Sequence, residues 1–183
     1  MLHRLPSSAV RRSAAGLALL AALALPATAF AADFPGTPGP DTLVGTDTGD
    51  VMHGLAGDDN LKGLAGADVV RGGDGRDHLW GGLGPDVLYG GDGGDWLYGG
   101  DGHDVLRGGA GPDVLHGGAK GDVIWAGAGR DIVYGGTGND IIRTGGDSTP
   151  DAVHCGPGWD VAYVGRGDIA DRSCERVIRH REP

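Results

Sequence analysis

The strongest chemical signal in this sequence is an aspartate that recurs at every ninth residue. Reading from Gly36, twelve consecutive nonamers run to Arg143 without an insertion or a deletion. Position six of every nonamer is Asp: Asp41, Asp50, Asp59, Asp68, Asp77, Asp86, Asp95, Asp104, Asp113, Asp122, Asp131 and Asp140. Carboxylates repeated so regularly would repel one another at neutral pH unless cations lay between them.

The residues around each aspartate narrow the choice of cation. Positions one, two and four of the nonamer are mostly Gly, which permits positive φ and brings backbone carbonyls close together in a turn. Calcium binds about six to eight oxygen ligands and mixes carboxylates with carbonyls, whereas magnesium requires a tighter octahedron that retains water. Zinc would require His or Cys ligands. The nonamer therefore predicts multiple calcium ions bound in glycine-rich turns.

Every nonamer also carries an apolar residue at position eight, and this second column indicates how the turns are positioned. Positions seven to nine are rich in Val, Ile, Leu, Trp and Tyr, which favour short strands whose alternate side chains face opposite ways. We expect a six-residue turn and then a three-residue strand in each nonamer, with position eight pointing inward. Two nonamers then complete one turn of an all-β, parallel β-roll that is stabilised by stacking of neighbours. Two invariant columns also argue against a disordered linker.

The nonamers follow the pattern Gly-Gly-x-Gly-x-Asp-x-apolar-x and resemble the RTX (hemolysin-type) calcium-binding nonapeptide repeat. The resemblance implies a β-roll over residues 36–143. It also implies that the position-six Asp and the turn carbonyls bind calcium between one turn and the turn two repeats later. The glycines whose carbonyls it implies as ligands are Gly72, Gly73, Gly75, Gly81, Gly82, Gly84, Gly90, Gly91, Gly93, Gly99, Gly100, Gly102, Gly108, Gly109 and Gly111.

Some turns depart from this pattern, and we expect them to bind calcium less well. The replacements are Thr37, Thr46, Leu55 and Leu64 at position two, and Thr48 and Lys120 at position four. Lys120 also adds a positive charge, so the sites that share its turn are predicted to be weak or empty. The regular stretch from Gly72 to His116 is predicted to bind best.

The first 31 residues are typical of a secretory signal peptide. Arg4, Arg11 and Arg12 give a basic start, residues 14–25 are apolar or Gly, and Ala29-Phe30-Ala31 offers a cleavage site. The apolar run is short for an uncleaved membrane anchor, which needs about 20 residues. Arg11-Arg12 could belong to a twin-arginine signal, but small residues follow it, which favours the general secretory route. We predict a secreted, extracellular protein whose mature chain, with no membrane span, begins with a short segment, 32–35.

Residues 144–183 are expected to hold degenerate terminal repeats and a C-terminal cap. Asp151 and Asp160 stand where position-six aspartates of two further repeats would fall. Cys155 and Cys174 are the two cysteines, and in an exported chain one disulfide between them is the simplest interpretation. A Cys-His metal site beside His154 is the alternative. The Cys-Gly-x-Gly-x-Asp segment and the Cys-Glu near the end also resemble small exported calcium-binding proteins of high-GC Gram-positive bacteria.

Charge and motifs limit the classes of function. The chain has 25 acidic and 15 basic residues and a net charge of −10, which argues against a nucleic-acid partner. It has neither a His-Glu-x-x-His nor a Gly-x-Ser-x-Gly motif, so we predict that it is not an enzyme. Arg166-Gly167-Asp168 matches an integrin-type tripeptide, a match expected by chance in such a composition. We predict non-catalytic calcium binding by a roll that folds on calcium outside the cell; the alternative is a calcium-dependent adhesin or scaffold with an unidentified cell-surface or matrix partner.

Overall fold

The computed structural model describes residues 32–145 and 147–179, and the predicted signal peptide lies outside these residues. All regular structure in the described part of the chain is β, and no helix occurs there. The strands are β1 (Asp33–Pro35), β2 (Thr42–Val44), β3 (Val51–Ala56), β4 (Asn60–Ala65), β5 (Val69–Asp74), β6 (His78–Leu83), β7 (Val87–Asp92), β8 (Trp96–Asp101), β9 (Val105–Ala110), β10 (Val114–Ala119), β11 (Val123–Ala128), β12 (Ile132–Thr137), β13 (Ile141–Arg143), β14 (Ala152–His154), β15 (Val161–Val164), β16 (Ile169–Ala170) and β17 (Arg176–Arg179).

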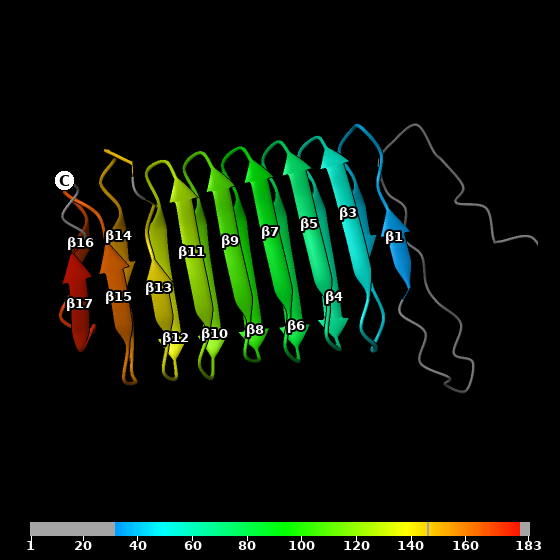
Figure 1. Cartoon of the computed structure of the whole chain (residues 1–183). Helices are drawn as coiled ribbons and strands as arrows, with labels where there is room; N and C mark the ends of the chain where they lie inside the picture. Colours follow the sequence, from blue (N-terminus) through cyan, green and yellow to red (C-terminus); the bar gives the residue numbers. More distant parts are fainter. Residues whose placement is uncertain (1–31, 146, 180–183) are drawn as a thin grey trace, which may run out of the picture.

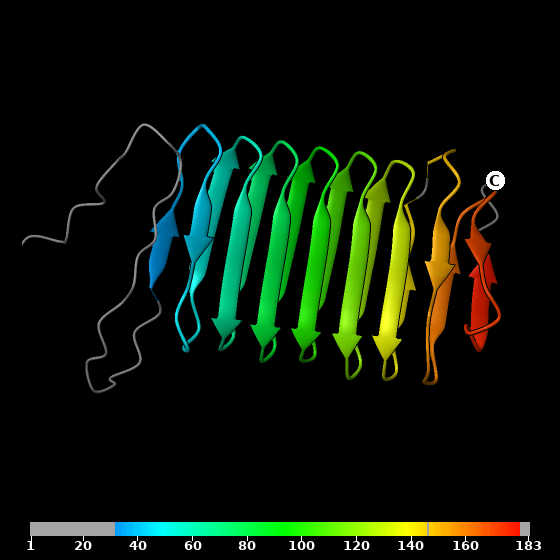
Figure 2. The same ribbon diagram turned by 180° about the vertical axis from the view of Figure 1, so that it is seen from behind.

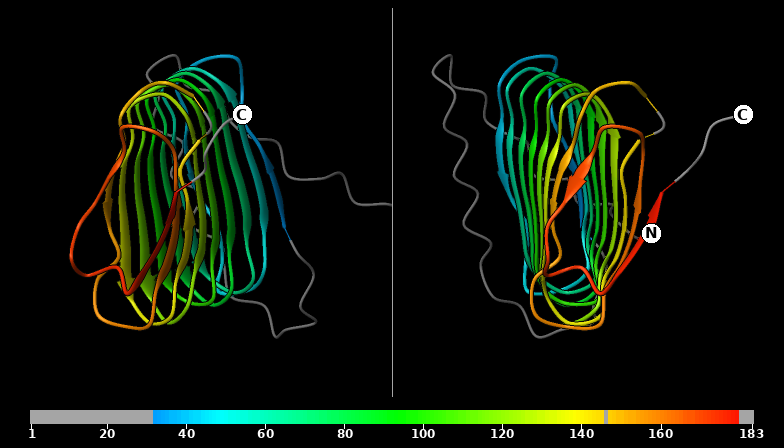
Figure 3. Two further views of the ribbon diagram at one scale, coloured as in Figure 1. Left: turned by 60° about the vertical axis from the view of Figure 1, so that its left-hand side comes forward. Right: turned by 90° about the vertical axis from the view of Figure 1, so that its left-hand side faces the viewer.

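The strands form two parallel sheets that wind into a solenoid (Figure 1). Odd-numbered strands make a nine-stranded sheet and even-numbered strands an eight-stranded sheet, in chain order in each case. Each strand pairs with the strand two further along, for example Val69 with Val87, so one turn of the coil uses two nonamers. Figure 2 shows the opposite side, and Figure 3 shows the two sheets facing each other with turns at both edges. The prediction of an all-β, parallel β-roll is confirmed.

The strands are longer than the three residues expected from the sequence. From β3 to β12 each strand has six residues and runs from position seven of one nonamer to position three of the next. The position-two residues join the ladder, as Gly73 pairs with Gly91. Position two is glycine in most repeats and has positive φ, for example 126° at Gly91, so the chain bends there without leaving the sheet. The turn proper is therefore confined to positions four to six.

The core lies between the two sheets and consists mainly of the position-eight side chains. Because successive side chains of a strand face opposite ways, position eight points inward while positions seven and nine point outward. The position-eight residues that are fully buried are Met52, Leu61, Val70, Leu79, Leu88, Leu97, Leu106, Leu115, Ile124, Val133 and Ile142. Val153 and Ala162 extend the same core beyond Arg143, and Phe34 and Leu43 pack against it at the other end.

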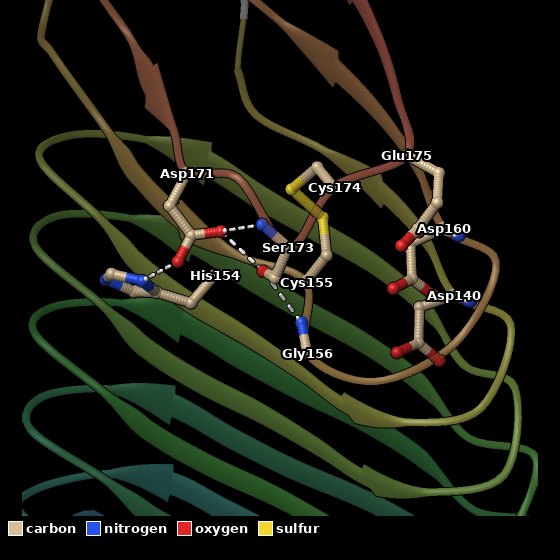
Figure 4. The surroundings of a disulfide bond; sticks show 9 residues. All are labelled: Asp140, His154, Cys155, Gly156, Asp160, Asp171, Ser173, Cys174 and Glu175. Atoms are coloured by element: carbon tan, nitrogen blue, oxygen red, sulfur yellow. Dashed lines mark hydrogen bonds and ion pairs between the residues drawn. A yellow bond between two sulfur atoms is a disulfide. The ribbon is translucent and has the colours of Figure 1, made fainter.

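The C-terminal segment continues both sheets and is tied by a disulfide between Cys155 and Cys174, as predicted (Figure 4). The alternative of a Cys-His metal site is wrong, because both sulfur atoms are used in this bond. His154 is instead hydrogen-bonded to Asp171, with 2.7 Å between Nδ1 and Oδ2. Asp171 also accepts hydrogen bonds from the backbone N–H and the hydroxyl of Ser173, and that hydroxyl accepts one from Gly156 N–H.

The close approach of backbones at position two makes a specific prediction. A methyl group on Gly91 would overlap the carbonyl oxygen of Gly73, and its φ of 126° disfavours any L side chain. Gly91→Ala should lower the free energy of unfolding by about 2 kcal/mol or more. Urea unfolding in saturating calcium measures this. Gly94→Ala is the matched control, because Gly94 lies in the same nonamer without positive φ and its added methyl group would come no closer than 3.1 Å to a neighbour. Equal losses for the two variants would contradict this explanation.

Candidate metal centre

The position-six aspartates line the two edges of the solenoid, each directly before a strand. Asp41, Asp59, Asp77, Asp95, Asp113 and Asp131 precede even-numbered strands and form one column. Asp50, Asp68, Asp86, Asp104, Asp122 and Asp140 precede odd-numbered strands and form the other column. All except Asp41, which is half-buried, are at most 1% exposed. The structure therefore buries a carboxyl group in almost every turn.

One oxygen of each carboxylate has a structural role. The backbone N–H of Asp77 donates to Oδ1 of Asp95 at 2.8 Å, and the same bond, at 2.8 to 2.9 Å, joins consecutive aspartates from Asp41 and Asp50 to Asp151 and Asp160. The carbonyl of Asp95 in turn accepts the N–H of Val114, the first residue of β10. Oδ1 thus stands in for a backbone carbonyl and extends the parallel ladder by one bond into the turn.

The other oxygen is buried and has no partner within the described chain. This holds for Oδ2 of Asp59, Asp68, Asp77, Asp86, Asp95, Asp104, Asp113, Asp122, Asp131, Asp140 and Asp160. Burying a carboxylate oxygen without a hydrogen bond or a counter-charge costs free energy, so we expect these atoms to bind a ligand. Eleven such atoms in two regular rows indicate one kind of ligand repeated along the roll.

A backbone carbonyl converges on the same point as nine of these oxygens, all except Oδ2 of Asp131 and Asp160. A methyl group on Gly72 would overlap Oδ2 of Asp77 and lie 2.8 Å from the carbonyl oxygen of Gly90. The same two kinds of oxygen meet at the other inner position-one glycines: Gly54, Gly63, Gly81, Gly90, Gly99, Gly108, Gly117 and Gly135. Carboxylate and carbonyl oxygens are the ligands that calcium prefers, so the residues present fit this ion.

The structure gives less direct support for the other predicted ligands, which are the carbonyls at positions two and four. The carbonyls at positions two and four point along the solenoid axis toward the next turn of the coil, since a methyl group on Gly91 would overlap Gly73 O and one on Gly93 would overlap Gly75 O. No three acidic, His or Cys side chains gather into a cluster within residues 32–145 and 147–179. An ion held in these turns would therefore take most of its protein ligands from the backbone.

In the calcium-free chain, burial raises the pKa of twelve carboxyl groups in the two columns: Asp59, Asp68, Asp77, Asp86, Asp95, Asp104, Asp113, Asp122, Asp131, Asp140, Asp151 and Asp160. Loss of hydration is the largest cause, neighbouring carboxylates add to it in most of the turns, and the hydrogen bond from the backbone N–H opposes it. The pKa is raised to about 6 for Asp59, Asp68, Asp95, Asp131 and Asp140, to about 7 for Asp86, Asp122 and Asp151, and to about 8 for Asp113.

The first two repeats differ, because threonine supplies the missing partner. The N–H of Thr46 donates to Oδ2 of Asp50 at 2.6 Å and its hydroxyl donates to the same atom at 3.0 Å. Thr37 makes the corresponding two bonds to Asp41 Oδ2. These threonines are two of the departures from the glycine pattern, and their hydrogen bonds leave neither Asp41 nor Asp50 with an unpaired Oδ2.

Both aspartate columns extend further than the sequence analysis recognised. The N–H of Asp151 donates to Oδ1 of Asp168 at 3.1 Å. The N–H of Asp160 donates to Oε2 of Glu175 at 2.8 Å, and Figure 4 shows these two residues beside each other. Asp168 is 5% exposed, and its Oδ2 accepts the Thr144 hydroxyl and the Gly165 N–H. The carboxyl group of the integrin-type tripeptide is therefore buried and hydrogen-bonded within the fold. An acidic residue directly before a short strand was the signal available in the sequence.

Lys120 is turned away from the carboxylates of the columns. Its φ is 75°, and its Nζ lies 2.9 Å from Oδ1 of Asp101, with both side chains more than half exposed. Oδ2 of Asp122, two residues further on, stays unpaired. Weak calcium binding in this turn remains a prediction, and its basis is the repulsion between the nearby ammonium group and a divalent cation.

The raised pKa values predict an unusual pH dependence for the calcium-free chain. In the unfolded chain an Asp carboxyl titrates near 3.8, whereas in the fold Asp95 titrates at about 6 and Asp113 at about 8. At pH values between the unfolded and the folded pKa, the folded chain binds more protons than the unfolded chain. The free energy of unfolding therefore falls as the pH rises from about 4 to about 8. Circular dichroism after removal of calcium should show more β structure at pH 4.5 than at pH 7.5. A calcium-free chain that gains structure over this rise in pH would disprove the prediction.

The nonamers match the sequence model of a known protein family. The family model described as RTX calcium-binding nonapeptide repeat (4 copies) matches residues 35–70, 53–88, 71–106, 80–115 and 107–142. These overlapping segments span residues 35–142, which is more than half of the 183 residues. No curated protein matches the chain.

Proposed function

The chain belongs to the RTX calcium-binding nonapeptide repeat family, and we propose that it is an exported, non-catalytic protein whose β-roll folds when it binds calcium outside the cell. Repeats of this family bind calcium on a β-roll. The observation that carries the proposal is the double row of buried Oδ2 atoms without a hydrogen-bond partner. Each row would be neutralised by calcium held between the carboxylate and the carbonyl oxygens of neighbouring turns.

Coupling of folding to calcium follows from the charge of the turns. In the absence of a cation, the fold must either bury ionised carboxylates or protonate groups that are ionised in the unfolded chain at neutral pH, and both cost free energy. The nonamer strands cannot recover this cost singly, since each buries one large side chain per repeat and depends on its neighbours. Ion binding would therefore contribute directly to the free energy of folding.

The sequence predicts all twelve position-six aspartates and the turn carbonyls as calcium ligands, and of the aspartates we propose the ten from Asp59 to Asp140, whose Oδ2 atoms are unpaired. The position-one carbonyls have the strongest support because they lie beside Oδ2. Support for a non-catalytic role comes from the burial of the same carboxyl groups, which are shielded from any substrate in solution. We propose that calcium binds only in turns that have an unpaired Oδ2. The turns of Asp41 and Asp50 have none, so they are proposed to bind no calcium.

Export is proposed from the sequence of residues 1–31 and from the family. RTX repeats typically act outside the cell, where calcium is abundant enough for sites with dissociation constants of about 10⁻⁴ to 10⁻³ M. The described residues contain no helix that is both long and apolar enough to cross a membrane. The general secretory route remains our proposal, with the twin-arginine route as the less favoured one.

Folding on calcium is tested by circular dichroism of the mature chain. In excess chelator at pH 7.5 we expect the spectrum of a largely unfolded chain, and millimolar calcium should restore a β spectrum cooperatively. Magnesium at equal concentration is the control, because it requires a smaller octahedral site. A full β spectrum in chelator, unchanged by calcium, would show that the fold does not depend on the ion.

The variant Asp95→Asn tests whether Oδ1 accepts the ladder hydrogen bond while Oδ2 binds calcium. Asn retains an acceptor for the Asp77 N–H but removes the charged Oδ2, so calcium stoichiometry should fall and the calcium midpoint should rise. Asp50→Asn is the matched control, because Thr46 already occupies Oδ2 there. Its stoichiometry should equal that of the unmodified protein. Equilibrium dialysis measures both, and an equal loss at the two positions would refute the assignment.

A further inference from the structure

The outer face of the nine-stranded sheet carries a row of arginines that calcium binding does not explain. On this sheet, position nine alternates between arginine and an aromatic residue along the solenoid: Arg71, Tyr89, Arg107, Trp125, Arg143 and Tyr163. The guanidinium carbon of Arg107 lies 5.6 Å from the Tyr89 ring centroid and 4.7 Å from that of Trp125. Arg71 lies 5.1 Å from Tyr89, and Arg143 lies 4.8 Å from Tyr163. The rings therefore hold the guanidinium groups in place.

The eight-stranded sheet shows that a stable column does not require arginine. From Trp80 onward its position-nine column is a continuous stack of rings, in which Trp80, Tyr98, His116, Tyr134 and His154 follow one another, and Lys62 lies over Trp80 at the start of the stack. Consecutive ring centroids are 4.4 to 5.8 Å apart and the ring planes lie within 13° of parallel. Ring stacking alone thus satisfies this position of the repeat. The arginines of the opposite sheet need another explanation.

These arginines have no acidic partner in the described part of the chain. The contacts between basic and acidic side chains there are the Lys120–Asp101 ion pair and the hydrogen bond of His154 to Asp171, and Arg71, Arg107 and Arg143 are all exposed. From β9 to β15 the nine-stranded sheet contains no acidic residue within its strands. A chain with a net charge of −10 therefore presents one face that is locally cationic, with a column of partly exposed apolar residues beside the arginines: Val105, Val123, Ile141 and Val161.

The spacing of the row indicates the shape of its ligand. Neighbouring strands lie ~4.8 Å apart, so arginines on alternate strands are ~9.6 Å apart along a straight line. A small anion would meet only one of them. A nucleic-acid strand carries a phosphate about every 3.4 Å, which a row of three widely spaced cations matches poorly. An extended polysaccharide with one carboxylate or sulfate in each disaccharide has a matching repeat, and its sugar C–H groups can pack on the valines and ring edges between the charges.

We propose that the outer face of the nine-stranded sheet, centred on Arg107 and Arg143, binds a linear anionic polysaccharide. The ligand lies along the solenoid axis, with one anionic group at each guanidinium. This binding site is separate from the calcium turns, because position nine lies on the strands and the position-six aspartates lie at the sheet edges. The bound polymer would bridge several turns of the coil and add cohesion between them.

Binding is measured with hyaluronan oligosaccharides, which carry one carboxylate per disaccharide, and with neutral dextran of equal length, both in saturating calcium. We expect hyaluronan to bind, dextran to fail, and Arg107→Gln/Arg143→Gln to raise the dissociation constant at least about tenfold. Arg76→Gln/Arg130→Gln removes the same charge from exposed turn positions and should change it less than about twofold. Circular dichroism in calcium verifies that each variant keeps the roll.

Three outcomes would overturn the proposal. They are no binding of hyaluronan by a folded, calcium-loaded protein, an equal loss of affinity in the two double variants, and tighter binding of duplex DNA than of hyaluronan at the same ionic strength. The first would show that the arginine row has no role in this recognition. The second would reduce the effect to net charge, and the third would assign the face to a nucleic acid. Each result is independent of the calcium assignment, because the roll is shown to be folded in the same sample.

Discussion

The structure depends on how a buried carboxylate is satisfied in every turn of the coil. A parallel solenoid with nine-residue repeats must reverse its chain direction within three residues, and there the ladder of backbone hydrogen bonds would otherwise stop. The Asp side chain extends this ladder with Oδ1, which fixes the turn but carries a second, charged oxygen into the interior. An oxygen-binding cation resolves that conflict, and we attribute the calcium dependence of the fold to it.

The same constraint explains the composition of the chain. Aspartate outnumbers glutamate 23 to 2, and in the inner turns the ladder bond is always made by a carboxylate one methylene from the backbone. Glu175, one of the two glutamates, is the last residue of its column, so no further turn of the coil has to pair with it. Threonine appears where the columns end: Thr37 and Thr46 at the first repeats and Thr144 beside Asp168. At these ends, hydroxyl and backbone donors take the place that we assign to calcium in the inner turns.

Much of this could be predicted from the sequence, since a period of nine with two invariant columns permits few folds. The parallel roll, the inward position eight and the Cys155–Cys174 bond followed from such patterns. The strand length was wrong, because glycine propensity alone suggested that position two belongs to the turn, whereas pairing with Gly91 keeps Gly73 in the sheet. The roles of Asp168 and Glu175 were missed because their partners lie 17 and 15 residues away, outside the period of nine.

The most direct test of the central claim is anomalous diffraction from crystals grown in calcium. The account predicts anomalous peaks about 2.3 to 2.6 Å from Oδ2 of Asp77, Asp86 and Asp95, each also contacting a position-one carbonyl. It predicts no peak at Asp50, where Thr46 donates to Oδ2. A folded roll whose Oδ2 atoms bind only water or protein donors in calcium, or equal peaks at Asp50 and Asp95, would contradict the account.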